Sequence, residues 1–255
     1  MSDEFGKLRQ AARQLLEGEL ALSDPFLPAG RNPLPPAPEQ EGSAGPGMTA
    51  DENAAALGAI DLDEVRNCTR CRLHQGRKNT VFGEGSPAAR LVFIGEGPGE
   101  EEDRTGRPFV GRAGELLNQM IGAMGLKRSD VYICNIVKCR PPSNRAPAAD
   151  EADACCDYLF RQLQILAPEV IVTLGNPSTQ KLLGTTVGIT KLRGQWQKLP
   201  MLLPGLGGID VLPTFHPAFV LRQYTADVRG KVWADLKLVM DRLGLSPPAK
   251  RSKGV

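Results

Sequence analysis

The stretch ARLVFIGEGPGEEED, residues 89–103, decides how this chain folds. It begins with an apolar run at 89–95 that is typical of a buried parallel strand, and the glycine-rich GEGPG that ends the run is typical of a tight turn. Similar apolar runs follow along the chain, at residues 130–137, 169–175 and 209–215.

Helical patterns separate and follow these runs. Segments with apolar residues at helical spacing lie at residues 113–124, 148–166, 177–183 and 228–243. Strands that alternate with helices predict an α/β fold, here a three-layer sandwich around a mainly four-stranded parallel sheet.

The end of each predicted strand carries residues that are unusual in a buried strand. They are Gly95-Glu96-Gly97, Asn135, Gly175-Asn176 and His216. Ligands of parallel sheets bind beyond the carboxyl ends of the strands. We therefore expect these residues to converge on one rim of the sheet.

The composition is that of a globular chain, with 255 residues of which 41% are hydrophobic and 24% are charged. The net charge of +2 is too small for a domain that binds nucleic acid through a broad basic surface, so any DNA contact should be local. No segment is apolar enough to span a membrane, and MSDEFGKLRQ at the N-terminus lacks an apolar signal core. We expect a cytoplasmic monomer that does not bind membranes.

Proline content divides the chain. Residues 24–49 hold seven prolines and almost no apolar periodicity, which indicates a disordered linker. We predict an N-terminal extension at 1–50, a packed domain at 51–245 and a short basic tail at 246–255. Residues 1–22 fit either a short amphipathic helix or a frayed tail. The extension suits a tether for a repair or replication partner.

The six cysteines of a chain without an export signal should be reduced, so their spacing indicates metal or redox chemistry. Cys68 and Cys71 form a C-x-x-C pair, and Cys139 and Cys155 lie further along. Four thiolates can hold a structural zinc or an iron–sulfur cluster, and the wide second spacing favours a [4Fe–4S] cluster over a zinc ribbon. The alternatives are four free buried thiols, or ligation by Cys156 in place of Cys155.

Three other residues have both a functional and a structural interpretation. His216 is either a catalytic group or a structural histidine. Phe109, in a polar glycine-rich loop, is either a stacking platform for a flat ligand or part of the core. Asn135 in a strand either pairs with the backbone or faces a ligand, because a buried amide needs a partner.

Several motifs together resemble the family 4 uracil-DNA glycosylases, the iron–sulfur branch of the uracil-DNA glycosylase superfamily. They are CTRC at 68–71, GEGPGEEED at 95–103, GRPFVGRAG at 106–114, NIVKCRPPSNR at 135–145, the cysteine at 155 and HPAFVLR at 216–222. The resemblance covers nearly all of residues 60–245. It implies a uracil-DNA glycosylase-like fold and hydrolysis of the bond between uracil and deoxyribose in DNA, which leaves an abasic site for base excision repair.

The resemblance also implies roles for individual residues. Phe109 would stack on uracil, Asn135 would read its edge and His216 would act as the electrophile. Glu96 and Gly97 would form the pocket wall, and catalysis would rest on His216, Glu96 and Asn135. The cluster ligands would be Cys68, Cys71, Cys139 and Cys155.

One position departs from the better-known branch of the superfamily, in which the first motif carries an aspartate that positions water. Gly97 stands in that place here, with Glu96 beside it. The departure leaves open a non-catalytic iron–sulfur module that binds uracil or DNA. A redox protein that uses Cys68 and Cys71 as an active dithiol is a further alternative.

Overall fold

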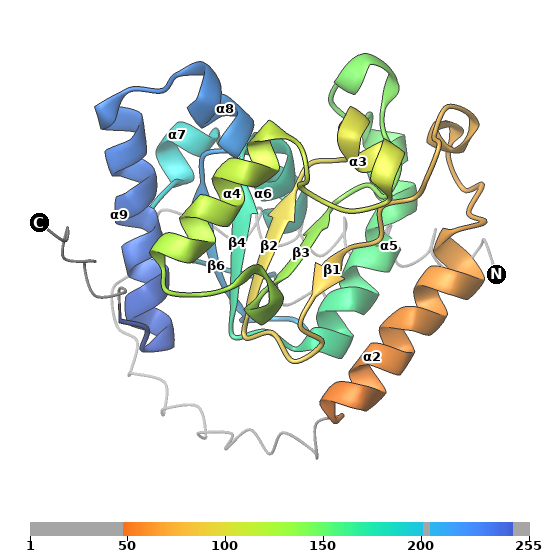
Figure 1. Ribbon diagram of the computed structural model, residues 1–255, viewed down its shortest axis with the longest axis horizontal. Coiled ribbons are helices and arrows are strands. Elements are labelled where there is room, and N and C mark those ends of the chain that lie inside the picture. The colour runs from red at the N-terminus through yellow and green to blue at the C-terminus, as the bar shows by residue number, and fades with distance from the viewer. Residues whose placement is uncertain (1–47, 201–204, 247–255) are drawn as a thin grey trace, which may run out of the picture. The chain divides into compact units, whose positions relative to one another are not determined.

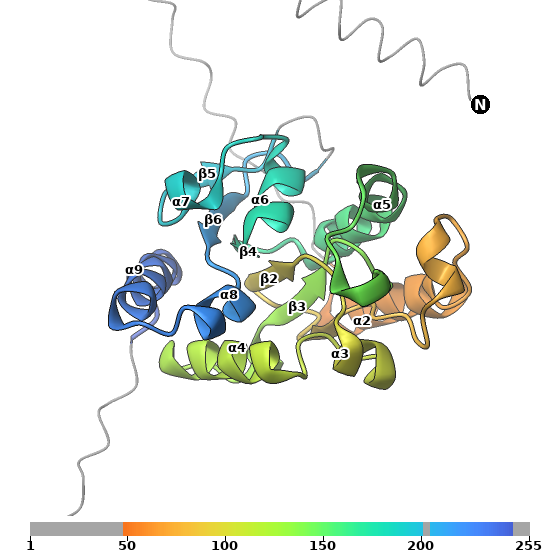
Figure 2. The same cartoon turned by 90° about the horizontal axis from the view of Figure 1, so that it is seen from above.

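The computed structural model describes residues 48–200 and 205–246, which belong to a compact unit, Pro46–Val255. Within these residues a six-stranded sheet has the strand order β1-β3-β2-β4-β6-β5. Figure 1 labels all of these strands except β5, which Figure 2 labels beside β6. The central strands, which run parallel, are β2 (Leu91–Gly95), β3 (Tyr132–Asn135), β4 (Val170–Leu174) and β6 (Asp210–Thr214). The antiparallel edge strands are β1 (Glu84–Gly85) and β5 (Gln197–Lys198).

The predicted α/β fold is confirmed, because each predicted apolar run contains one central parallel strand. The strands are shorter than the runs. For example, β3 ends at Asn135, although Ile136 and Val137 of the same run are buried as well. Every residue of β2, β3 and β4 is buried, as expected for strands covered on both faces. The edge strands β1 and β5 were not predicted, because two residues carry no periodicity.

The strands pack one core on each face of the sheet, because alternate side chains point to opposite faces. In β2, Leu91 and Phe93 face one core, and Val92 and Ile94 face the other. The first core is covered by α4 (Arg112–Ala123), α8 (Pro217–Arg222) and α9 (Ala226–Leu243), and the second by α2 (Ala50–Ala59), α5 (Ala149–Leu166) and α6 (Asn176–Leu183). Figure 2 shows the three layers from above.

The four predicted helices correspond to α4, α5, α6 and α9. The sequence analysis missed α2, whose start carries a capping box in which Thr49 and Glu52 bond each other's backbone amide. It also missed short elements inside the loops. These are α3 (Glu100–Thr105), α7 (Ile189–Leu192), α8, and single turns at Arg72–Gln75, Arg128–Asp130 and Pro142–Asn144. A six-residue π-helix, Ile60–Val65, directly continues α2.

The predicted extension at 1–50 and basic tail at 246–255 fall almost entirely outside the described residues. The division into extension, domain and tail therefore stays a prediction, as do the partner of the extension and the monomeric state. None of the helices in 48–200 and 205–246 combines the length and the apolar character needed to cross a membrane.

Candidate active site

A pocket of about 770 Å³ opens beyond the carboxyl ends of the four parallel strands. Because the four strands are parallel, they all end at the same edge of the sheet, and the residues at the end of each strand line the pocket. The five residues predicted to contact the base all line it: Glu96, Gly97, Phe109, Asn135 and His216.

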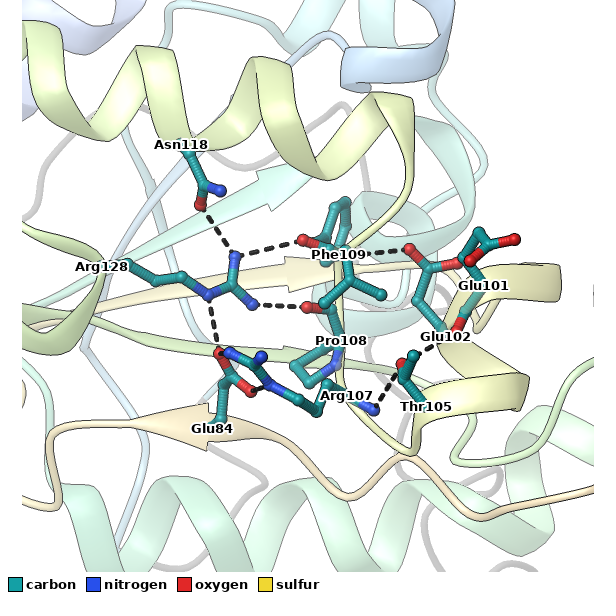
Figure 3. Close-up of polar contacts among 10 residues, drawn as sticks. Glu84, Glu101, Glu102, Thr105, Arg107, Pro108, Phe109, Asn118 and Arg128 are labelled. Carbon is teal, nitrogen blue, oxygen red and sulfur yellow. Dashed lines mark hydrogen bonds and ion pairs between the residues drawn. The ribbon is translucent and has the colours of Figure 1, made fainter.

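Phe109 lies at the tip of the turn between α3 and α4 and is buried in the pocket wall. Its φ of +50° is a left-handed conformation that a bulky side chain rarely adopts. Glu102 of α3 fixes one side of the turn, because its Oε1 accepts hydrogen bonds from the amides of Val110 and Gly111, each at 2.9 Å. Its Oε2 accepts from the amide of Gly99 at 3.1 Å. One carboxylate thus joins the Phe109 turn to the glycine-rich turn after β2. Figure 3 shows Glu102 against the Phe109 turn.

Asn135, the last residue of β3, is 1% exposed. Its side-chain oxygen Oδ1 is buried without a hydrogen-bond partner, as is that of only one other residue in the described part of the chain. A Cβ built on Gly95 would lie 2.4 Å from this oxygen and 2.5 Å from Cζ of Phe109. Glycine at this position therefore gives the carboxamide and the ring room beside each other, and the free oxygen is placed for a donor on a ligand.

His216 follows β6 and caps the N-terminus of α8. Its Nδ1 accepts a hydrogen bond from the amide of Ala218 at 3.1 Å, so the ring proton sits on Nε2. Burial, with a smaller effect of the positive Arg222, lowers the pKa of His216 to about 4. The ring lies 5.7 Å from that of Phe109, centroid to centroid, at 33°. His216 thus presents a neutral N–H donor beside the Phe109 ring.

Glu96 and Gly97 form the turn after β2 that walls the pocket. Burial raises the pKa of the Glu96 carboxyl. A Cβ built on Gly97 would lie 2.7 Å from Cγ2 of the buried Val137. A side chain at position 97 therefore needs Val137, two residues after β3, to move, which is a physical reason for glycine there.

Comparisons with known proteins agree with this geometry. The family model described as the uracil DNA glycosylase superfamily matches residues 82–237. A type-4 uracil-DNA glycosylase of Thermotoga maritima is 49% identical over 70% of this chain and 90% of its own length. One of Sulfurisphaera tokodaii is 46% identical over 72% of this chain and 84% of its own length. A type-5 uracil-DNA glycosylase of Pyrobaculum aerophilum is 29% identical over 62% and 80%. This chain belongs to the type-4 uracil-DNA glycosylase family.

The resemblance found in the motifs is thereby confirmed. In this type-4 glycosylase the four cysteines assigned to a cluster come from three separate segments. Cys68 and Cys71 lie before the turn at Arg72–Gln75, Cys139 follows β3 and Cys155 lies in α5. All four line one small hollow, together with Tyr158. Cys156 is buried in the same core but does not line the hollow, so the structure places Cys155, rather than its neighbour, with the other three.

The charges around the hollow fit a cluster held by thiolates. Lys138 lines it and is 1% exposed, yet its Nζ bonds only neutral acceptors, the backbone oxygen of Asn135 at 2.9 Å and Oε1 of Gln162 at 2.5 Å. Arg77 donates to Sγ of Cys139 at 3.2 Å. A buried cation is costly without an anion nearby, and a thiolate-bound cluster carries net negative charge. Within the described residues, no three His, Cys, Asp or Glu side chains are arranged to hold a single metal ion.

Some functional contacts of this glycosylase were not predicted. The carboxylate of Glu102 lies in an acidic run, EEED, whose members the sequence does not distinguish. Arg145, in the loop after β3, is bound to Glu151 at 2.6 and 2.8 Å. Asn144 and Arg222 line the pocket as well. Only the structure shows which side chains of the loops face the pocket.

Proposed function

We propose that this chain removes uracil from DNA by hydrolysing its N-glycosidic bond, and that Asn135 selects the base. The unpartnered Oδ1 of Asn135 carries the proposal, because a buried acceptor without a donor is a costly arrangement unless a ligand supplies the donor. Uracil supplies one at N3–H. The base must first leave the duplex, since its edge is otherwise paired and its glycosidic bond is covered.

The same carboxamide distinguishes uracil from cytosine. It accepts from N3–H of uracil and donates to O4, whereas cytosine presents an acceptor at N3 and a donor at C4. Each mismatched buried polar group costs about 1–3 kcal/mol. Thymine has the hydrogen-bonding edge of uracil, so its methyl group has to be excluded by shape. The turn at Glu96 and Gly97 is our candidate for that wall.

Phe109 contacts the face of the base, and His216 contacts its O2 atom. The Phe109 ring stacks on the pyrimidine face. As the bond between C1′ and N1 breaks, its electron pair leaves with uracil and spreads onto O2, while the sugar becomes cationic. A neutral His216 donates Nε2–H to O2 and stabilises the departing anion more than the bound base. Removal of such a donor costs about 10²–10³ in rate.

Water completes the reaction by adding its oxygen to C1′, and its proton leaves to solvent. Glu96 is our candidate for orienting this water, because it is an acidic side chain next to Gly97, which stands in the place of the usual aspartate. In a largely dissociative route the sugar cation captures water, so the reaction depends little on a carboxylate that positions the water. Such a route agrees with a glycine at position 97.

We infer that Cys68, Cys71, Cys139 and Cys155 hold a [4Fe–4S] cluster. These cysteines would tie the C-x-x-C segment, the end of β3 and α5 together through the bound cluster. Lys138, which lines the same hollow, bonds the backbone of Asn135, so a cluster held there would support the strand end that carries the base-reading amide. The bond from Lys138 to the strand end favours a structural role for the cluster.

The test uses a single-stranded oligonucleotide with one uracil, and matched oligonucleotides with cytosine or thymine instead. Wild-type protein with measured iron content should release uracil but neither cytosine nor thymine. The variant His216→Ala should release uracil about 10²- to 10³-fold more slowly. Intact glycosidic bonds in iron-loaded wild type would overturn the proposal. Tight binding of the uracil strand without release would select the non-catalytic binding module.

A further inference from the structure

The turn that carries Phe109 holds an unfavourable backbone conformation in the pocket wall. A left-handed φ at a bulky residue is unfavourable and persists only where the surroundings enforce it. Glu102 restrains the amides that follow Phe109. The carbonyl groups of the turn need a restraint of their own.

Arg128 supplies that restraint from the turn just before β3. Its Nη1 donates to the backbone oxygen of Phe109 at 3.2 Å, and its Nη2 donates to that of Pro108. The guanidinium is itself fixed, because Nη1 also donates to Oδ1 of Asn118 at 2.9 Å and Nε donates to Oε1 of Glu84 at 2.7 Å. Figure 3 shows the fork between these partners. Only 20% of the Arg128 side chain is exposed.

The contacts come from elements that are far apart in the sequence. Glu84 belongs to β1, Asn118 to α4 and Arg128 to the turn before β3. Arg128 therefore ties the Phe109 turn to both an edge strand and a helix. A shift of the turn would break the bonds from Arg128 to two carbonyl groups in a largely buried place, while Asn118 and Glu84 would still hold the guanidinium where it is. One geometry of the turn is therefore strongly favoured.

We propose that Arg128 is a positioning residue for uracil excision: by binding the carbonyl groups of Pro108 and Phe109 it holds the Phe109 ring at the angle that stacks on the base. The proposal rests on the proposed function. Arg128 itself does not line the pocket, so it acts through Phe109 and not on the substrate.

Arginine is the side chain that this arrangement needs. Four acceptors lie around one plane, and the guanidinium offers donors in a fixed fork. Lysine keeps the charge but presents its donors from a single nitrogen on a flexible stem, so Arg128→Lys should restore only part of the geometry. Glutamine removes the charge and most of the donors.

The experiment is a double-variant cycle on kcat/KM for the uracil oligonucleotide. We expect a loss of about 10- to 100-fold for Arg128→Gln and an intermediate loss for Arg128→Lys. In the Phe109→Ala background, Arg128→Gln should add less than about 2-fold, because the residue through which it acts is gone. The matched control is Arg107→Gln, which removes the other partner of Glu84 but no contact to the turn carbonyls, and it should change kcat/KM less than about 2-fold.

A second readout is independent of activity. The chain has two histidines, and the ring of His216 lies 5.7 Å from that of Phe109. The imidazole carbon–proton NMR signals of His216 therefore report the position of the aromatic ring. In Arg128→Gln they should move toward their position in Phe109→Ala, while those of His74 should stay.

Each outcome decides the matter. Losses that multiply in the double variant, or unchanged His216 signals in Arg128→Gln, would overturn the positioning role. If Arg128→Gln does not fold, Arg128→Lys carries the same cycle and the same spectra. A wild type that releases no uracil overturns the proposed function instead, and the spectra still report whether Arg128 holds the ring.

Discussion

The protonation of His216 follows from one hydrogen bond to its ring and from the burial of that ring. The amide of Ala218 occupies Nδ1, and burial lowers the pKa to about 4. We predict that single-turnover uracil release shows no inflection near pH 6.5, the ordinary pKa of histidine, from about pH 5 to pH 8. The measurement is the rate across this range for wild type and His216→Gln. An inflection near 6.5 that vanishes in the variant would contradict the neutral-donor role.

The same lowered pKa has a consequence for stability. Below pH 6.5 the unfolded chain takes up a proton at His216, and the folded chain does so only near pH 4. The stability that this residue contributes is therefore complete above pH 6.5 and is lost as the pH falls toward 4. The free energy of unfolding of wild type should fall more steeply than that of His216→Gln in this window, as urea titrations at several pH values would measure.

Two buried asparagines test the role of the base-reading amide. Asn135 and Asn53 both carry a buried Oδ1 without a partner, but only Asn135 lines the pocket. Asn135→Ala should lower kcat/KM by about 5- to 150-fold, the equivalent of one lost polar contact of about 1–3 kcal/mol. Asn53→Ala removes the bond to Pro87 and should affect stability alone. Equal losses of activity in both variants would argue against base reading by Asn135.

At the scale of the element, α4 approaches the Phe109 turn through Gly114. A Cβ at this position would lie 1.9 Å from the backbone oxygen of Phe109, whereas one at Gly122, in the same helix, would meet nothing within 4 Å. We predict that Gly114→Ala moves the turn and lowers uracil release at least about 10-fold, with a stability loss of about 1–3 kcal/mol. Gly122→Ala should raise stability by about 0.5–1 kcal/mol with activity unchanged. Thermal unfolding and uracil release of both variants give the comparison.

The elements also show what the sequence could predict. A short apolar run bounded by turn residues, such as the one that contains β2, is typical of a strand covered on both faces, so the sheet and its rim followed from pattern. Helix α3 and the left-handed Phe109 have no such pattern. The conformation of the Phe109 turn depends on Glu102 in α3 and on Arg128 before β3, which both bind its backbone. Tertiary contacts of this kind leave no local periodicity to detect.

At the scale of the whole molecule, Glu151 joins the segments around the cysteine hollow. It is fully buried, and it accepts from Arg72, next to the C-x-x-C pair, at 2.7 Å and from Arg145 at 2.6 Å. The motifs predicted the four cysteines, but the spacing of charges along the chain gave no sign of this carboxylate. The hydrogen bond from Arg145, with further bonds from Arg72 and Ala148, outweighs burial and lowers the pKa of Glu151 to about 2.

Glu151→Gln is therefore expected to weaken the bonds that hold Arg72 and Arg145 to α5 beside the cysteine hollow. The variant should lose about 1–3 kcal/mol of stability, discounted from a fully buried pair because both arginines are partly exposed, and it should purify with less iron. The matched change is Glu169→Gln, which breaks an exposed pair with Arg90 and should cost less than about 1 kcal/mol without loss of iron.

Because the folded pKa of Glu151 is depressed, its contribution to stability is complete above pH 4.5 and is lost as the pH falls toward 2. Wild type and Glu151→Gln should thus converge in stability at acid pH, and a gap that persists there would show that Glu151 acts by packing instead of charge.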